Sequence, residues 1–280
     1  MRIIFSRKGF DSSNGGFSSP IFPDGTCYSV PIPGKRNRKK YQELDFRYEN
    51  EPIQAILNDL TRKSIKINGK RKSCDYFDDK FICHLDPLVM EDGENQYMTL
   101  GQVGSALGHL KNQNVQVGDI FLFYGFFREV EQTTIWRYKN NAKNLHLIFA
   151  YMKIDKIVNV NENLSAKYQF LKNHPHFDES FRKKYRENYI FLGQNFRMFD
   201  YDTKRVLTDL NNYKKTSRWK LPINFDFSNY ISYIKSVKVI ENNAYISHKG
   251  PGQEFVVNLD KMTKQKQKAF LNYLEILEVL

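Results

Sequence analysis

Cysteine, long apolar runs and the common nucleotide-binding motifs are scarce or missing in this sequence. The chain has only three cysteines, Cys27, Cys74 and Cys83, without CxxC spacing, so neither a disulfide framework nor a zinc knuckle is indicated. No apolar run approaches the roughly 20 residues that span a bilayer. The segment 1–6 is too short in apolar residues for a signal-peptide core. We therefore expect a cytoplasmic protein that does not associate with membranes.

Several catalytic signatures are absent as well. The sequence contains no P-loop, no GxGxxG after a predicted strand and no HExxH, which disfavours the common ATPases, dinucleotide-dependent enzymes and zinc peptidases. His174 and His176 are separated by one residue, but no cysteine or carboxylate cluster follows them closely. We therefore expect no metal ion and no other cofactor.

Positive charge and aromatic residues are abundant instead. Lys and Arg outnumber Asp and Glu by 43 to 31, which gives a formal charge of +12, and 15% of the residues are aromatic. Such a surplus suits a polyanionic partner, because each neutralised phosphate releases condensed counterions. A Lys-rich proteome would explain the charge equally simply. The densest run holds five cations in six positions and is either a solvated loop or a phosphate-contacting arm: Lys35, Arg36, Arg38, Lys39 and Lys40.

Local patterns predict helices and strands in mixed order. Strands are expected at 2–5, 81–85, 120–127, 145–157 and 188–193, a hairpin around Asn68-Gly69, and helices at 52–63, 99–112 and 260–280, with a polar helical stretch within 161–202. In the second helix, Thr99 and Gln102 have the spacing of a capping box. The pattern predicts one α+β domain over 1–280, with a mixed, partly barrel-like (PUA-like) sheet and flanking helices.

The loop after the first strand is the strongest candidate site. It brings together Ser6, Arg7, Lys8 and Asp11, followed by two adjacent glycines. Arg7 and Lys8 could clamp a phosphate, and an ionised Asp11 could orient water or stabilise a positively charged sugar. In the alternative interpretation, Asp11 caps a turn and Arg7 pairs with it. The residue types alone favour neither interpretation of the loop.

Three further positions carry candidate chemistry. His84 and Asp86 share a strand face and could act as an acid–base pair, although a turn begun by Asp86-Pro87 explains the spacing as well. Gln102 and His109 share one face of the predicted helix, and Gln102 could read a base edge. Glu254 follows a glycine-bearing segment and would matter if it converged on Asp11.

Motifs along most of the chain, in order, resemble the nucleotide modification associated domain 3 family. They are 5–13 (FSRKGFDSS), 15–16, 18–21, 23–25, 84–87 (HLDP), 101–104 (GQVG), 108–110, 118–123 (GDIFLF), 126–128, 146–149, 174–176 (HPH) and 252–255 (GQEF). Leu88 departs from the pattern, because the resemblance predicts an acidic residue after Pro87. This family is associated with phage and bacterial systems that modify DNA bases or respond to modified ones. The polar positions that the resemblance carries over are Ser6, Arg7, Lys8, Asp11, His84, Asp86, Gln102, His109, Arg128 and Glu254.

The resemblance implies a DNA-directed enzyme, and our hypothesis is glycosylase-type excision of a hypermodified base in phage defence. A nucleotide flipped from double-stranded DNA would stack on Tyr124, Phe126 and Phe127, with Asp11, His84 and Glu254 as the catalytic groups. The other carried-over residues and the basic run would bind the nucleic acid. Two alternatives stay open: a non-catalytic reader of modified bases, and a nuclease or group-transfer enzyme of a modification system.

Overall fold

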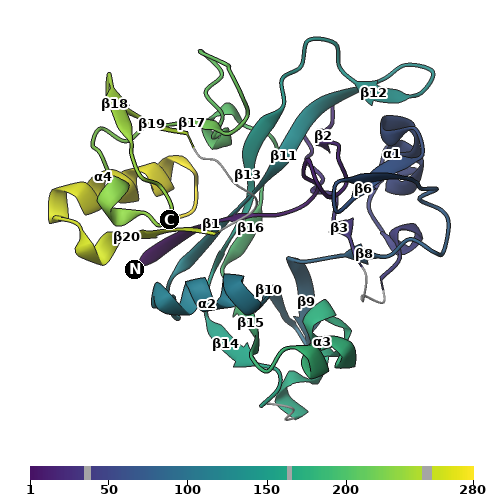
Figure 1. Cartoon of the computed structure of the whole chain (residues 1–280), viewed down its shortest axis with the longest axis horizontal. Helices are drawn as coiled ribbons and strands as arrows, with labels where there is room; N and C mark the ends of the chain where they lie inside the picture. Colours follow the sequence, from purple (N-terminus) through teal and green to yellow (C-terminus); the bar gives the residue numbers. More distant parts are fainter. Residues whose placement is uncertain (35–38, 163–165, 248–253) are drawn as a thin grey trace.

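The computed structural model describes residues 1–34, 39–162, 166–247 and 254–280. Its centre is a seven-stranded sheet in the order β16-β13-β11-β1-β20, with β2 and β12 also paired to β11 (Figure 1). The strands of this sheet are β1 (Arg2–Arg7), β2 (Ser19–Ile21), β11 (Ile120–Gln132), β12 (Trp136–Tyr138), β13 (Leu145–Lys153), β16 (Phe196–Met198) and β20 (Phe255–Asn258). β1 runs parallel to β11 and antiparallel to β20.

Both faces of the central sheet are covered. Ile3 and Phe5 of β1 belong to one core and Ile4 to another, so successive side chains enter different layers. Strands buried on both faces read as continuous apolar runs, which is the pattern of 120–127. α4 (Lys264–Ile276) covers one face and confirms the C-terminal helix expected from its apolar stripe (Figure 1). A three-stranded sheet packs on the same side: β17 (Arg218–Leu221), β18 (Lys238–Ile240) and β19 (Asn243–Ser247).

A four-stranded sheet in the order β14-β15-β10-β9 packs on the opposite face of the central sheet. It consists of β9 (Leu88–Asp92), β10 (Asn95–Val103), β14 (Lys156–Asn159) and β15 (Asn188–Gly193), with α2 (Gly104–Asn112) following β10. The prediction of a helix beginning at Thr99 was wrong. The Thr99 hydroxyl donates to the Leu88 carbonyl at 2.8 Å, across β9, so sheet pairing replaces the expected helix cap.

The remaining N-terminal part has its own core around α1 (Ile53–Thr61), which confirms the helix predicted at 52–63. Its short strands are β3 (Ile32–Pro33), β4 (Arg47–Tyr48), β5 (Glu51–Pro52), β6 (Ser64–Ile67), β7 (Lys70–Ser73) and β8 (Cys83–His84). β6 and β7 form the hairpin predicted around Asn68-Gly69, where both residues have positive φ.

The short helices lie mostly in connections: α3 (Glu179–Lys184), η1 (Tyr41–Glu43), η2 (Ala166–Asn173), η3 (Pro175–Phe177), η4 (Thr203–Arg205), η5 (Ser228–Tyr230) and η6 (Leu259–Lys261). The α+β class is confirmed, but none of the sheets within the described residues closes into the expected PUA-like barrel. The central sheet stays open because, within the described residues, its outer strands β16 and β20 do not pair with each other. No helix in the described part of the chain is long and apolar enough to span a membrane.

Candidate functional site

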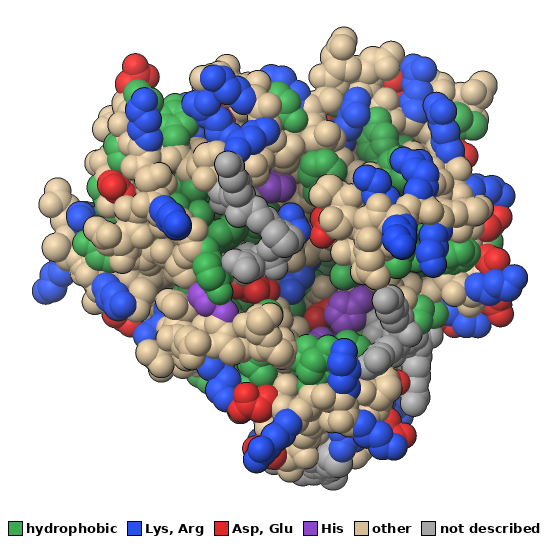
Figure 2. All heavy atoms as spheres, viewed as in Figure 1, with side chains coloured by type: hydrophobic (Ala, Val, Ile, Leu, Met, Phe, Trp, Pro, Cys, Tyr) green, Lys and Arg blue, Asp and Glu red, His purple; other side chains and the backbone are tan. Residues whose placement is uncertain are grey.

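The ends of β1, β8, β10 and β20 meet around a polar cavity of about 350 Å³. Figure 2 shows acidic, basic and histidine side chains gathered in the central hollow of one face. Among the residues that line the cavity are Arg7, Lys8, Asp11, His84, Asp86, Gln102, His176 and Glu254. The structure therefore brings together Asp11, His84 and Glu254, the three residues that the sequence nominated for catalysis.

Glu254 is held by the register of the central sheet. Phe5 pairs with Phe255 across β1 and β20, so the residue before Phe255 lies beside Ser6. The Ser6 hydroxyl donates to Glu254 Oε1 at 3.3 Å, and Gln102 Nε2 donates to the same oxygen at 2.9 Å. Lys8 Nζ lies 3.8 Å from it. With a side chain only 7% exposed, Glu254 is a fixed carboxylate at the wall of the cavity.

Asp86 is a second buried carboxylate, surrounded by histidines. Both its oxygens accept from the Gly101 amide at 3.1 Å. Burial alone would raise the pKa of Asp86, but the hydrogen bond from His84 and the surrounding positive charge outweigh burial and hold this pKa below its ordinary value. Burial lowers the pKa of His174 to about 3 and that of His176 to about 4. Asp86 is therefore an ionised carboxylate in contact with buried imidazoles.

Asp11 has the contacts of a turn-capping residue. Its Oδ1 accepts from the amides of Ser13 and Asn14 at 2.7 Å each, and its Oδ2 accepts from Arg7 Nη2 at 3.2 Å. Every one of these contacts was part of the alternative interpretation from sequence. Asp11 lines the cavity, and through the ion pair it fixes the Arg7 guanidinium there.

Asp11→Ala should therefore lower the free energy of unfolding by about 1–3 kcal/mol, because two turn amides and a guanidinium lose their charged acceptor. Asp11→Asn keeps a side-chain oxygen for the turn amides, so its free energy of unfolding should fall by less. Urea denaturation followed by circular dichroism measures both. Equal stability of Asp11→Ala and the parent chain would show that the turn does not depend on this carboxylate.

The expected nucleic-acid contacts are only partly gathered at the cavity. His109 bonds with Ser232 Oγ at 3.1 Å, and burial lowers its pKa. Arg128 lies over the Tyr138 ring, 5.3 Å from the centroid, on the far part of β11. Lys39 pairs with Asp45 and lines a neighbouring pocket, and Lys40 pairs with Asp79. The other cations of the basic run, Lys35, Arg36 and Arg38, lie outside the described residues.

The stacking surface expected from Tyr124, Phe126 and Phe127 is not available to a base. Tyr124 is 1% exposed and packs edge-on against Trp219, and Phe127 is fully buried. Phe126 is half-buried, with its ring 6.4 Å from that of His146. These side chains lie on the buried strand β11, where both faces of the sheet are covered, so the aromatic run builds core.

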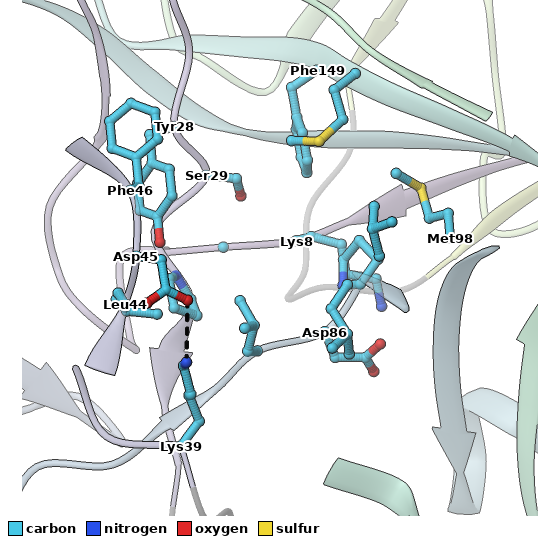
Figure 3. A pocket seen from close by; sticks show the side chains of 17 residues that line it. Lys8, Tyr28, Ser29, Lys39, Leu44, Asp45, Phe46, Asp86, Met98 and Phe149 are labelled. Atoms are coloured by element: carbon cyan, nitrogen blue, oxygen red, sulfur yellow. Dashed lines mark hydrogen bonds and ion pairs between the residues drawn. The ribbon is translucent and has the colours of Figure 1, made fainter. Parts of the chain in front are cut away.

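Another set of aromatic residues lines an apolar pocket of about 400 Å³ beside the polar cavity. Tyr28 and Phe46 stack with their ring centroids 4.3 Å apart, and Phe149 and Met98 also line the pocket. Figure 3 shows this pocket with the two stacked rings at one end and Lys8 and Asp86 at the other. Lys8, Gly9 and Asp86 line both hollows, so the pocket and the cavity are adjacent.

Sequence reasoning undervalued His174 and His176. Their Nε2 atoms lie 3.7 Å from Asp86 Oδ1 and Oδ2, respectively. A carboxylate close to them in the sequence would have indicated a site at these histidines. The carboxylate that they approach, Asp86, lies far from them in the sequence. In the sequence Gly101 is marked only by a motif. In the structure the absence of a side chain at Gly101 leaves room for the His176 ring.

The fold and site together define an α+β protein with a polar cavity rich in carboxylates, histidines and cations, next to an aromatic pocket. Residues 2–258 match the family model for nucleotide modification associated domain 3, and the chain belongs to this family. The family description associates the chain with nucleotide modification, as the sequence resemblance implied. No curated protein and no solved structure matches the chain.

Proposed function

We propose that the chain is an enzyme that hydrolyses the N-glycosidic bond of a modified nucleotide in DNA and releases the base. The observation that carries this proposal is Glu254, a buried carboxylate whose position is fixed by Ser6 and Gln102 at the wall of a cavity. Breaking an N-glycosidic bond leaves positive charge on the sugar, and a fixed carboxylate stabilises that charge.

The two adjacent hollows suit the two halves of a nucleotide. The apolar pocket offers Tyr28 and Phe46 to a base removed from the helix stack. The polar cavity offers Arg7 and Lys8 to a phosphate. The sugar would then lie where the hollows meet, beside Asp86, with Glu254 on the cavity wall. The formal charge of +12 suits DNA as the substrate polymer.

The remaining catalytic candidates take supporting roles in this proposal. His84, whose Nε2 lies 3.6 Å from Asp86 Oδ2, is only partly buried and is the group placed to assist the leaving base. Asp11 acts through Arg7, which it holds at 3.2 Å, and is a positioning residue. A site of this kind would let the protein act on hypermodified phage DNA in antiviral defence.

The test uses two duplexes of one sequence, with and without hypermodified cytosines. Incubation with the full chain should release free base and leave abasic sites only in the modified duplex, as measured by chromatography and an aldehyde-reactive probe. Strand cutting without base release would overturn the proposal in favour of a nuclease. Tight binding of the modified duplex without any turnover would overturn it in favour of a reader.

A further inference from the structure

Three side chains from two distant parts of the chain present potential metal ligands at one point of the cavity wall. His84 Nε2 lies 3.6 Å from Asp86 Oδ2, and His176 Nε2 lies 3.7 Å from the same oxygen. All three ligand atoms lie within 4.8 Å of one another. Ligands of a tetrahedral ion with bonds of about 2.0–2.1 Å are about 3.4 Å apart, so small side-chain movements would close the site.

The hydrogen bonds of Asn188 fix the orientation of the His176 ring. Asn188 Nδ2 donates to the His176 carbonyl at 2.7 Å, so Asn188 turns its amide oxygen toward His176 Nδ1, 2.8 Å away. His176 Nδ1 must therefore carry the ring proton. In this tautomer the lone pair of Nε2 faces the Asp86 carboxylate, 3.7 Å from Oδ2. Two electron-rich atoms facing each other are stabilised by a cation between them.

His174 supports the same carboxylate from another side. The His176 amide donates to His174 Nδ1 at 3.1 Å, so in the neutral ring Nε2 carries the proton. This Nε2 is fully buried, has no hydrogen-bond partner among the residues that the structure describes, and lies 3.7 Å from Asp86 Oδ1. With its N–H toward Oδ1, His174 fits an orienting role for the carboxylate and leaves Oδ2 to an ion.

We propose that His84, Asp86 and His176 bind one divalent first-row transition-metal ion at the wall of the polar cavity. Two imidazole nitrogens and one carboxylate oxygen suit Zn²⁺ or Fe²⁺, whereas Mg²⁺ prefers an all-oxygen shell. Three protein ligands leave coordination positions open to water or substrate, and all three residues line the cavity that Glu254 also lines. The proposal goes beyond base release and does not depend on it, and it gives His84 Nε2 the role of a metal ligand in place of that of a proton donor.

The test measures metal binding directly in the full chain after treatment with a chelator. Zn²⁺ titration by calorimetry should show one equivalent bound, and Co²⁺ should give the visible absorption of a low-symmetry site. An anaerobic Fe²⁺ titration distinguishes which ion binds more tightly. Asp86→Asn should weaken Zn²⁺ and Co²⁺ binding at least tenfold, and so should His176→Phe, which keeps a ring beside Gly101 but provides no ligand.

His109→Gln is the matched control, because His109 lies on α2 and bonds with Ser232, outside the proposed ligand set. Its metal affinity should equal that of the parent chain. Asp86→Asn retains an oxygen for the Gly101 amide, so its folding can be checked by circular dichroism. Absence of Zn²⁺, Co²⁺ and Fe²⁺ binding by the parent chain would overturn the proposal. So would unchanged affinity in a folded Asp86→Asn chain, or binding of Mg²⁺ in preference to the others.

This experiment separates the metal site from the proposed function. A chain that binds Zn²⁺ or Fe²⁺ through these ligands but releases no base would keep the metal site and reject the glycosylase proposal. A chain that releases base but binds none of the ions would support the glycosylase proposal and reject the metal site.

Discussion

Glu254→Gln should lower the single-turnover rate of base release about 10²–10⁴-fold, equivalent to about 3–5 kcal/mol of transition-state stabilisation. The loss follows from charge, because an amide cannot stabilise a positively charged sugar as a carboxylate does. The fold should survive. The contacts from Ser6, Gln102 and Lys8 all converge on Oε1, and a glutamine oxygen can take the place of that atom.

Glu241→Gln is the control for this prediction, because Glu241 is an exposed residue between β18 and β19. It removes the same formal charge from the chain without touching the cavity. The released base is measured at saturating protein, and melting temperatures are recorded for both variants. If a folded Glu254→Gln chain released base as fast as Glu241→Gln, the carboxylate would have no part in catalysis.

Gly101→Ala should disable the site through a steric effect. A Cβ atom at position 101 would lie 2.2 Å from Cδ2 and 2.3 Å from Cγ of His176. The His176 side chain is only 4% exposed and is bonded to Asn188, so it cannot move aside freely. Overpacking of this kind costs about 1–3 kcal/mol of folding stability. The displaced ring should also abolish Co²⁺ binding, because His176 is one of the three proposed ligands.

Gly108→Ala is the matched control in the neighbouring helix α2. Within the described part of the chain, a Cβ atom at Gly108 would have no atom within 4 Å apart from its chain neighbours and the backbone of its own helix. Alanine in a helix interior is favoured over glycine by about 1 kcal/mol, so this variant should be slightly more stable than the parent chain. Denaturant midpoints, Co²⁺ absorbance and base release are compared between the two variants. A Gly101→Ala chain with parental stability and Co²⁺ binding would contradict the steric argument.

Elements with strong local signals could be predicted from the sequence. Three elements were predicted from local residue patterns and form as expected: the buried strand at 2–5, the helix α1 with its apolar stripe, and the turn at Asn68-Gly69. The helix predicted from Thr99 failed because the capping-box spacing is local, whereas β9 and β15 pair with both sides of β10. Tertiary pairing overrode a weak local preference there.

The candidate site could be predicted only in part, for a related reason. Asp11 and His84 stood out because each sits near a strand end with polar neighbours. The meeting of Asp86 with His174 and His176 depends on β10 and η3 being packed together through Gly101, which no local pattern encodes. The aromatic run of β11 misled the search for a stacking surface, since a strand buried on both faces needs the same residues.

The pairing of β1 with β20 has a consequence for biosynthesis. Ser6 leaves the ribosome 248 residues before Glu254, its hydrogen-bond partner. Contacts so distant along the chain form late, because the intervening loop must first be closed. A nascent chain therefore lacks its central carboxylate until most of the fold exists. For the proposed glycosylase, this order would keep the carboxylate out of the polar cavity until the neighbouring apolar pocket is already built.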